Sequence, residues 1–232
     1  MPAKNTLKPY VENSYYHLYN RGVEKRIIFQ DEQDYSVMLS YLKTYLLPKE
    51  ENKLRTELVN PQISYKERDK ILKLLLLNNF SDEITLISYC LMPNHFHFLI
   101  KQKSETGIDR FMRSLCTRYT MFFNRKYKRV GPLYQTAYKA VLVDTEEQLL
   151  QLTKYIHRNP LGENFVPKDQ ILSKLYSQPS SLPEYLGERN TDWVHGEEIL
   201  AFFSKTNSNL SYKTFIGQTE DISLIGEKII DY

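Results

Sequence analysis

The sequence predicts an α+β fold, a ferredoxin-like sandwich in which helices pack on one antiparallel sheet. Two observations lead to this prediction. Segments with the two-residue period of strands alternate with segments of helical period, in the order strand, helix, strand, strand, helix, strand, helix. The middle two strands are joined by only Met92, Pro93 and Asn94, so they are expected to form a hairpin. A β-α-β-β-α-β pattern results, and one further helix follows it.

The first predicted strand covers residues 15–21 and is rich in tyrosine. Asp31 is placed to cap a helix that runs to about Leu47, and Pro48 stops it. The segment 48–82 is charged and helix-prone, and we interpret it as an inserted helical excursion, an arm or a lid. Its apolar residues are most simply expected to pack on the main core (Ile71, Leu72, Leu75 and Leu76).

The predicted hairpin consists of strands at 84–91 and 95–101, and a helix at 105–127 follows it with apolar residues at helical spacing. A further strand is predicted at 137–143. The helix after that strand covers 146–158.

Asp144 or Thr145 is expected to cap this last helix, and Pro160 to end it. We expect residues 1–160 to form one domain and residues 161–232 to form a helical C-terminal appendage.

Basic residues are concentrated between Lys101 and Lys139. This stretch contains ten Lys or Arg residues against Glu105 and Asp109, so it carries +8, and the rest of the chain sums to −5 of the net +3. Such a segment is typical of a polyanion site. The alternative is a solvated helix face, and the charges alone do not decide between the two.

The apolar segments and the cysteines bear on where in the cell the protein is expected. Apolar runs such as that at 74–77 are far too short to cross a bilayer, and residues 1–10 lack the apolar core of a signal peptide. The two cysteines, Cys90 and Cys116, fall inside predicted elements. We therefore expect buried free thiols in a reducing compartment.

The hairpin contains a His-Phe-His pattern. Side chains alternate along a strand, so His95 and His97 point to one face while Phe96 and Phe98 point to the other, into the core. Two imidazoles at this spacing can chelate one divalent metal ion. Two half-exposed histidines without a metal remain an alternative.

The last helix carries Tyr155 and Asn159, four residues apart and hence on one face if the helix persists to that point. Because Pro160 follows, Asn159 could instead be the helix C-cap. The chain has 18 tyrosines, so position alone does not single out Tyr155.

Several stretches resemble the single-tyrosine HUH transposases, and most closely the branch associated with repetitive extragenic palindromes (REP), which are IS200-like transposases. The two most specific are SYCLMPNHFHFLI (88–100) and LTKYIHRNP (152–160). The resemblance extends, in the family's order, to YHLYNRG (16–22), IFQDEQDY (28–35), FFNRKY (122–127), GPLYQTAYKAVLVD (131–144) and DWVHGEEILAFF (192–203). The insertion at 48–82 departs from the family pattern.

The resemblance implies that residues 1–160 form an HUH tyrosine nuclease and transposase domain. It implies a metal-dependent endonuclease and strand transferase that acts on single-stranded hairpin or palindromic DNA through a covalent phosphotyrosine intermediate, in DNA transposition and recombination. Tyr155 would be the nucleophile, and His95, His97 and Asn159 the metal ligands. The implied metal is Mg²⁺ or Mn²⁺, although imidazoles alone would suit zinc better. A monomer or homodimer is expected, in the bacterial cytoplasm and on the nucleoid when bound to DNA.

DNA contacts are expected from basic residues near phosphates and from aromatic residues that stack on unpaired bases. Asn20 and Arg21, at a strand end, could read DNA or brace the active site, and His157 is expected to be structural or to contact a phosphate. The remaining candidates are Arg113, Arg118, Arg125, Lys126, Lys128, Arg129 and Arg158, with Tyr127, Tyr134 and Tyr138 as the stacking residues.

Two other functions compete with the transposase. One is a hairpin-binding protein without catalysis, against which the intact His95, His97 and Tyr155 set argues. The other is a metal hydrolase that uses water, which would need a general base, yet neither motif contains Asp or Glu. The lack of a Cys-x-x-Cys motif argues against a zinc deaminase.

Overall fold

A computed structural model describes residues 10–162, 167, 170–218 and 225. Within this part of the chain, four strands form one antiparallel sheet in the order β2-β3-β1-β4. The strands are β1 (Tyr15–Arg21), β2 (Ile84–Met92), β3 (His95–Gln102) and β4 (Lys139–Val143). The predicted α+β class, the hairpin and the β-α-β-β-α-β order are confirmed.

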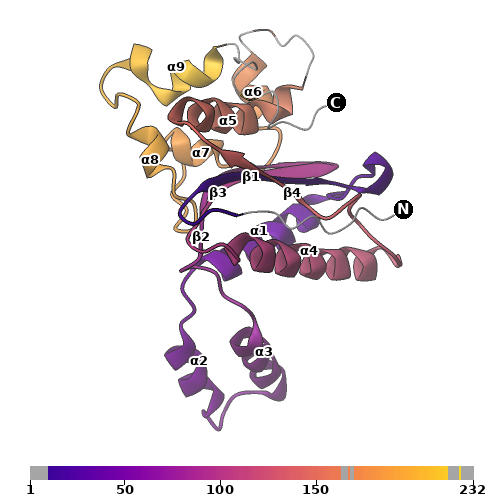
Figure 1. Cartoon of the computed structure of the whole chain (residues 1–232). Coiled ribbons are helices and arrows are strands. Elements are labelled where there is room, and N and C mark those ends of the chain that lie inside the picture. Colours follow the sequence, from indigo (N-terminus) through magenta and orange to yellow (C-terminus); the bar gives the residue numbers. More distant parts are fainter. Residues whose placement is uncertain (1–9, 163–166, 168–169, 219–224, 226–232) are drawn as a thin grey trace.

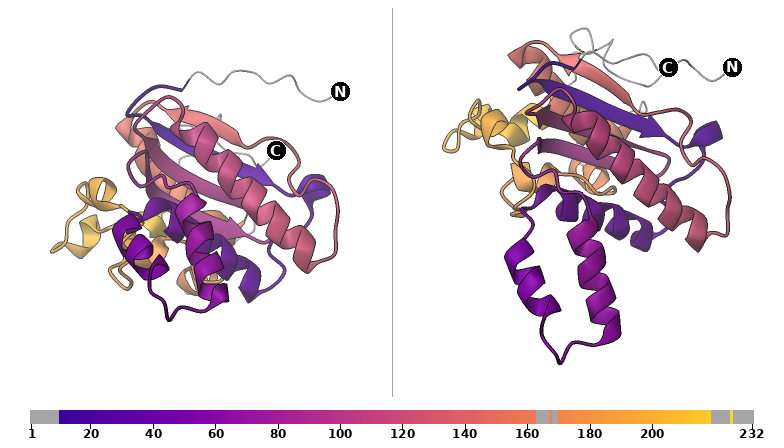
Figure 2. Two further views of the ribbon diagram at one scale, coloured as in Figure 1. Left: turned by 90° about the horizontal axis from the view of Figure 1, so that it is seen from below. Right: turned by 60° about the horizontal axis from the view of Figure 1, so that its bottom comes forward.

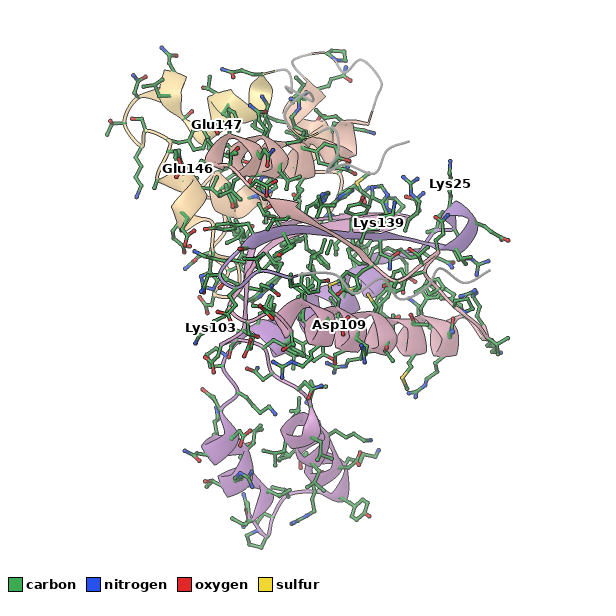
Figure 3. All side chains as sticks on the ribbon, viewed as in Figure 1. Lys25, Lys103, Asp109, Lys139, Glu146 and Glu147 are labelled. Carbon is green, nitrogen blue, oxygen red and sulfur yellow. The ribbon has the colours of Figure 1, made fainter. Side chains whose placement is uncertain are left out.

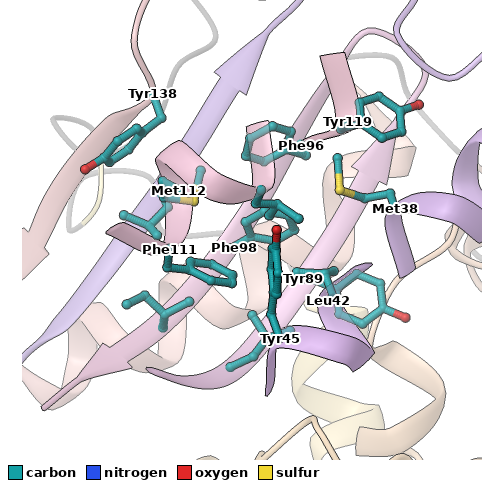
Figure 4. Packing of buried hydrophobic residues seen from close by; sticks show 14 of the residues in the cluster. Met38, Leu42, Tyr45, Tyr89, Phe96, Phe98, Phe111, Met112, Tyr119 and Tyr138 are labelled. Atoms are coloured by element: carbon teal, nitrogen blue, oxygen red, sulfur yellow. The ribbon is translucent and has the colours of Figure 1, made fainter. Parts of the chain in front are cut away.

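Two helices, α1 (Glu32–Leu46) and α4 (Gly107–Lys126), cover one face of the sheet (Figure 1). The side chain of Asp31 caps α1 by accepting from the backbone N–H of Asp34, as predicted. Phe96 and Phe98 from β3 pack into this layer beside Phe111 of α4 (Figure 4). Each large apolar side chain removed from water here contributes roughly 1.5–3 kcal/mol to stability.

The opposite face carries α5 (Glu146–Arg158), whose N-cap Thr145 accepts from the Gln148 N–H. A second cluster of buried residues joins α5 to the sheet, including Leu99 of β3 and Leu152 of α5. The sheet therefore lies between two apolar layers, and the site side chains described below lie on the α5 side.

The C-terminal segment packs beside α5 (Figure 1). Its elements are α6 (Ile171–Leu175), α7 (Leu182–Tyr185), α8 (Glu197–Leu200), η4 (Ser208–Leu210) and α9 (Tyr212–Gly217). Backbone hydrogen bonds attach it to β2, from Ser181 N–H to the Tyr89 carbonyl and from His195 N–H to the Leu86 carbonyl. No helix in the described ranges is long and apolar enough to span a membrane.

Residues between α1 and β2 form a helical arm, α2 (Glu51–Leu58) and α3 (Tyr65–Leu76), which projects away from the sheet (Figures 1 and 2). Ser64 and Glu67 form a capping box that starts α3. The expectation that this segment packs on the main core is wrong, because Leu72 is 43% exposed and Leu76 is 85% exposed. The spacing of apolar residues is the same in a helix of a projecting arm as in a helix of the core, so the sequence could not distinguish the two arrangements.

Excising the arm should leave the sandwich folded. The two ends of the arm are held together at its base, where the Lys49 ammonium donates to the carbonyls of Leu75 and Leu77, and where Asn79 donates to the Leu47 carbonyl. Replacing residues 50–76 with a short Gly/Ser linker should lower the melting temperature by no more than about 5 °C, the shift expected for 1–2 kcal/mol in a chain of this size. Loss of a cooperative melting transition would show that the arm is part of the folding unit.

Candidate active site

The alternation of side chains along β3 positions two histidines on the α5 side of the sheet. His97 is fully buried and His95 is 7% exposed, whereas Phe96 and Phe98 enter the α1/α4 layer. The predicted division of the His-Phe-His pattern between two faces is confirmed.

The last turn of α5 brings Tyr155 and Asn159 over these histidines. Asn159 is the helix C-cap and keeps helical dihedral angles (φ −49°, ψ −35°), so it remains on the same face as Tyr155. The Tyr155 ring meets the His97 ring edge to face, with centroids 5.5 Å apart and planes at 89°. The short 3-10 turn η2 (Asn159–Leu161) then ends the helix at Pro160. The structure thus brings together four residues that the sequence analysis selected.

The Asn159 amide lies between the two histidines. Its Oδ1 is 3.0 Å from His95 Nε2, and its Nδ2 is 3.3 Å from His97 Nε2. Because an amide nitrogen can only donate, His97 Nε2 must present its lone pair to the site. One amide group therefore contacts the Nε2 atoms of both histidine rings.

These donors fit a divalent cation. Asn94 Nδ2 donates to the Lys25 carbonyl (3.3 Å), which turns Asn94 Oδ1 toward His95 Nδ1 (2.6 Å). Both nitrogens of His95 consequently face a side-chain carbonyl oxygen, that of Asn94 and that of Asn159. No three His, Cys, Asp or Glu side chains within the described residues form a metal-binding group, so a metal here depends on the Asn159 oxygen and on further oxygens from outside.

Burial controls the protonation of His97. Desolvation, reinforced by the nearby His95, His17 and Arg21, holds the pKa of His97 well below its usual range. The ring is therefore neutral at physiological pH, which is the form that ligates metals.

Three residues near this site were not selected from sequence. His17 of β1 contacts His97 Nδ1, Asn94 contacts His95, and Lys139 of β4 lies 5.6 Å above the ring of Tyr19. Tyr19 is the cross-strand neighbour of both His97 and Lys139, which places Lys139 on the histidine face of the sheet (Figure 3). Asn94 is next to His95 in the sequence, whereas only the strand order brings His17 and Lys139 to this face of the sheet, without a local sequence signal beyond the alternation within β1.

Most of the predicted basic DNA contacts lie on the other side of the sheet, on α4 or just after it. Arg113 pairs with Asp109 (2.6 Å), and Arg118 lies 3.8 Å above the Tyr41 ring. Figure 3 labels Asp109 on α4, across the sheet from α5. Arg125 and Lys128 are exposed, and Arg129 donates to Asn124. The charge excess read from the sequence therefore follows the α4 layer and does not surround the histidines.

Lys126 and the expected stacking tyrosines have structural partners. The Lys126 ammonium pairs with Asp31 (2.6 Å) and with Asp34 (2.7 Å), which ties α4 to α1. Tyr127 donates to Asp34. Tyr134 and Tyr138 are each 8% exposed and belong to the core, so their burial does not favour the expectation that their rings stack on unpaired bases, which stays a prediction.

The remaining candidates have bracing contacts. Asn20 donates to the Thr136 carbonyl and accepts from the Arg21 N–H, which agrees with the bracing interpretation. Arg158 donates to the Ile216 carbonyl of α9. His157 is fully buried between Tyr212 and Ser181, so its structural interpretation is confirmed and a phosphate contact is ruled out.

Acid should destabilise the protein through His157. Burial lowers the pKa of His157 to about 3 from 6.5, so the unfolded state binds the extra proton first as the pH falls. The neutral ring makes its full contribution to the free energy of unfolding above pH 6.5. This contribution is lost between pH 6.5 and 3, by up to about 1.4 kcal/mol per pH unit. Urea unfolding of His157→Gln should show a smaller pH slope than the wild type over this window. Equal slopes would mean that other groups set the acid sensitivity.

Comparison with known families gives the context of the site. Residues 52–159 match the family model described as "Transposase IS200 like". These residues, slightly under half of the chain, are similar to the IS200-like transposases. The match contains the histidine pair, Tyr155 and Asn159, and it ends at Asn159 itself. The sequence resemblance to IS200-like transposases is confirmed.

Two solved structures are similar to this chain. One is a REP-associated tyrosine transposase bound to a REP hairpin, with 10% identity, a TM-score of 0.47, and coverage of 88% of this chain and 94% of that one. The other is a candidate transposase from Deinococcus radiodurans R1, with 17% identity, a TM-score of 0.28, and coverage of 64% and 92%. No curated protein matches the chain.

Proposed function

We propose that this transposase cleaves and rejoins single-stranded DNA at hairpins or palindromes, through a covalent bond between Tyr155 and a DNA phosphate. One observation carries the proposal: the amide of Asn159 is in contact with the Nε2 atoms of both His95 and His97, one helical turn from Tyr155. The family match over the same residues supports DNA transposition as the setting.

The chain offers His95 Nε2, His97 Nε2 and Asn159 Oδ1 to hold a divalent cation. We propose Mg²⁺ or Mn²⁺, with the remaining oxygen ligands supplied by the substrate phosphate and water. When bound, such an ion supplies a positive charge that polarises the phosphate and favours the ionised phenol.

Tyr155 supplies the nucleophile. In cleavage, the Tyr155 oxygen forms a bond to phosphorus as the bond from phosphorus to the 3′ oxygen breaks; the phenolic proton passes to water, and the 3′ oxygen takes up a proton. The phosphodiester bond energy is conserved in the tyrosyl ester, so a 3′-hydroxyl can reverse the step and join strands without ATP.

The protein fixes the geometry of this attack. Tyr155 is 6% exposed, and its ring rests against His97, so the phenol has little freedom to rotate away. A nucleophile held in place avoids much of the entropy cost of reaching the reactive position.

Incubation with labelled single-stranded hairpin DNA and Mn²⁺ or Mg²⁺, followed by a denaturing gel and peptide mapping, tests the proposal. We expect a metal-dependent covalent adduct on the peptide that contains Tyr155. Metal-dependent cutting without an adduct would instead indicate a hydrolase that uses water, and binding without cutting would indicate a non-catalytic hairpin-binding protein.

A further inference from the structure

His17 is a buried histidine that the proposed chemistry does not use. It is fully buried on β1, and its Nε2 lies 2.9 Å from His97 Nδ1. The two ring planes are inclined by only 15°, with centroids 5.1 Å apart, so the ring nitrogens can face each other in a nearly planar hydrogen bond. Burying an imidazole is costly unless its polar atoms have partners, and this contact provides one for each ring.

The direction of this hydrogen bond follows from Asn159 on the other side of His97. The Asn159 Nδ2 group can only donate, so His97 Nε2 accepts. A neutral imidazole carries one proton, so the proton of His97 is on Nδ1, which donates to the Nε2 lone pair of His17. The opposite tautomer of His97 would put its Nε2–H against the N–H of Asn159.

We infer that His17 is a positioning residue, which holds His97 in the tautomer and orientation that present its Nε2 lone pair to the site. This inference rests on the proposed function, because it assigns His17 a role behind a proposed metal ligand. The Nε2 atom of His17 is in contact with His97 Nδ1 and is therefore not free to bind the metal itself. Metal-binding histidines commonly use their second nitrogen in this way, and removing the partner typically lowers metal affinity by about 10–100-fold.

Two variants separate the acceptor from the bulk of the ring. His17→Phe keeps a ring in the buried position but removes the acceptor, whereas His17→Gln keeps an acceptor oxygen. Tyr19→Phe is the matched control, because Tyr19 lies on the same strand and face and its ring also neighbours His97 (6.2 Å).

The first measurement is long-range ¹H–¹⁵N NMR of histidines in the metal-free full chain. We expect His97 to carry its proton on Nδ1 in the wild type, in His17→Gln and in Tyr19→Phe. In His17→Phe this preference should be weaker, because only Asn159 then favours it. The second measurement is Mn²⁺ affinity by titration, with a loss of about 10–100-fold expected for His17→Phe and less than about 3-fold for the other two.

The two possible failures are distinguishable. A wild-type chain that binds no Mn²⁺ would overturn the proposed metal site. Wild-type Mn²⁺ binding that is unchanged in His17→Phe, with His97 still protonated on Nδ1, would overturn the role of His17 alone. If His17→Phe does not fold, His17→Gln decides: a loss of Mn²⁺ affinity as large as 10-fold in a folded His17→Gln protein, in which an acceptor is retained, would also contradict the inference.

Discussion

Replacing Tyr155 with Phe should abolish the covalent protein–DNA adduct and reduce strand cleavage by roughly 10³-fold or more, because no other group can take the place of the nucleophile. The ring remains, so the edge-to-face contact with His97 and the packing of α5 should persist. Binding of the hairpin, measured by fluorescence anisotropy, should change by less than about 3-fold, because one hydroxyl contributes little to a surface dominated by phosphate contacts.

Tyr19→Phe is the control for this prediction, since Tyr19 is also buried and also lies against His97. This variant should form the adduct at close to the wild-type rate. Retention of metal-dependent cleavage in Tyr155→Phe would overturn the phosphotyrosine mechanism and favour water as the nucleophile. Loss of cleavage in both variants would point instead to a general disturbance of the histidine face.

The features that were predictable from sequence are those with a local physical cause. Asp31 and Thr145 were placed at helix starts because a short polar side chain satisfies the first free N–H groups of a helix, and both do so. The two faces of the His-Phe-His pattern follow from the geometry of any strand. The pairing of Tyr155 with Asn159 needs only the helical repeat, and Asn159 keeps helical dihedral angles.

The features that were missed depend on the order of the strands and layers. His17 lies 80 positions before His97, and only the placement of β1 beside β3 brings their rings together. The basic residues of α4 were expected to contact DNA phosphates, and the sequence did not show that α4 covers the opposite face of the sheet from α5. The partners of Lys126 could not be predicted from sequence for the same reason, because Asp31 and Asp34 lie more than 90 residues earlier, at the start of α1.

Changing Asn159 to Leu or to Asp should have opposite effects on metal binding. Asn, Asp and Leu side chains are similar in size and shape, so the space next to His95 and His97 stays filled. Leu removes the oxygen that faces His95 Nε2, and Mn²⁺ affinity should fall by about 100-fold or more, since the loss of a direct ligand should cost at least as much as the loss of an outer partner. Asp keeps an oxygen and adds negative charge, so Mn²⁺ affinity should stay equal or increase.

Comparing the Leu and Asp variants shows whether the oxygen or the N–H group of the Asn159 amide is needed for Mn²⁺ binding. Asp cannot donate to His97 Nε2 as the Asn159 amide does, so a site held together only by this hydrogen bond should be damaged by both substitutions. A cation between the carboxylate and the two ring nitrogens would remove that conflict, because all three atoms would then bind to it. Titration of the metal-free variants with Mn²⁺, together with their melting temperatures with and without the ion, measures this directly. Equal weakening by Leu and Asp would mean that Asn159 braces the histidines rather than holding a metal ion.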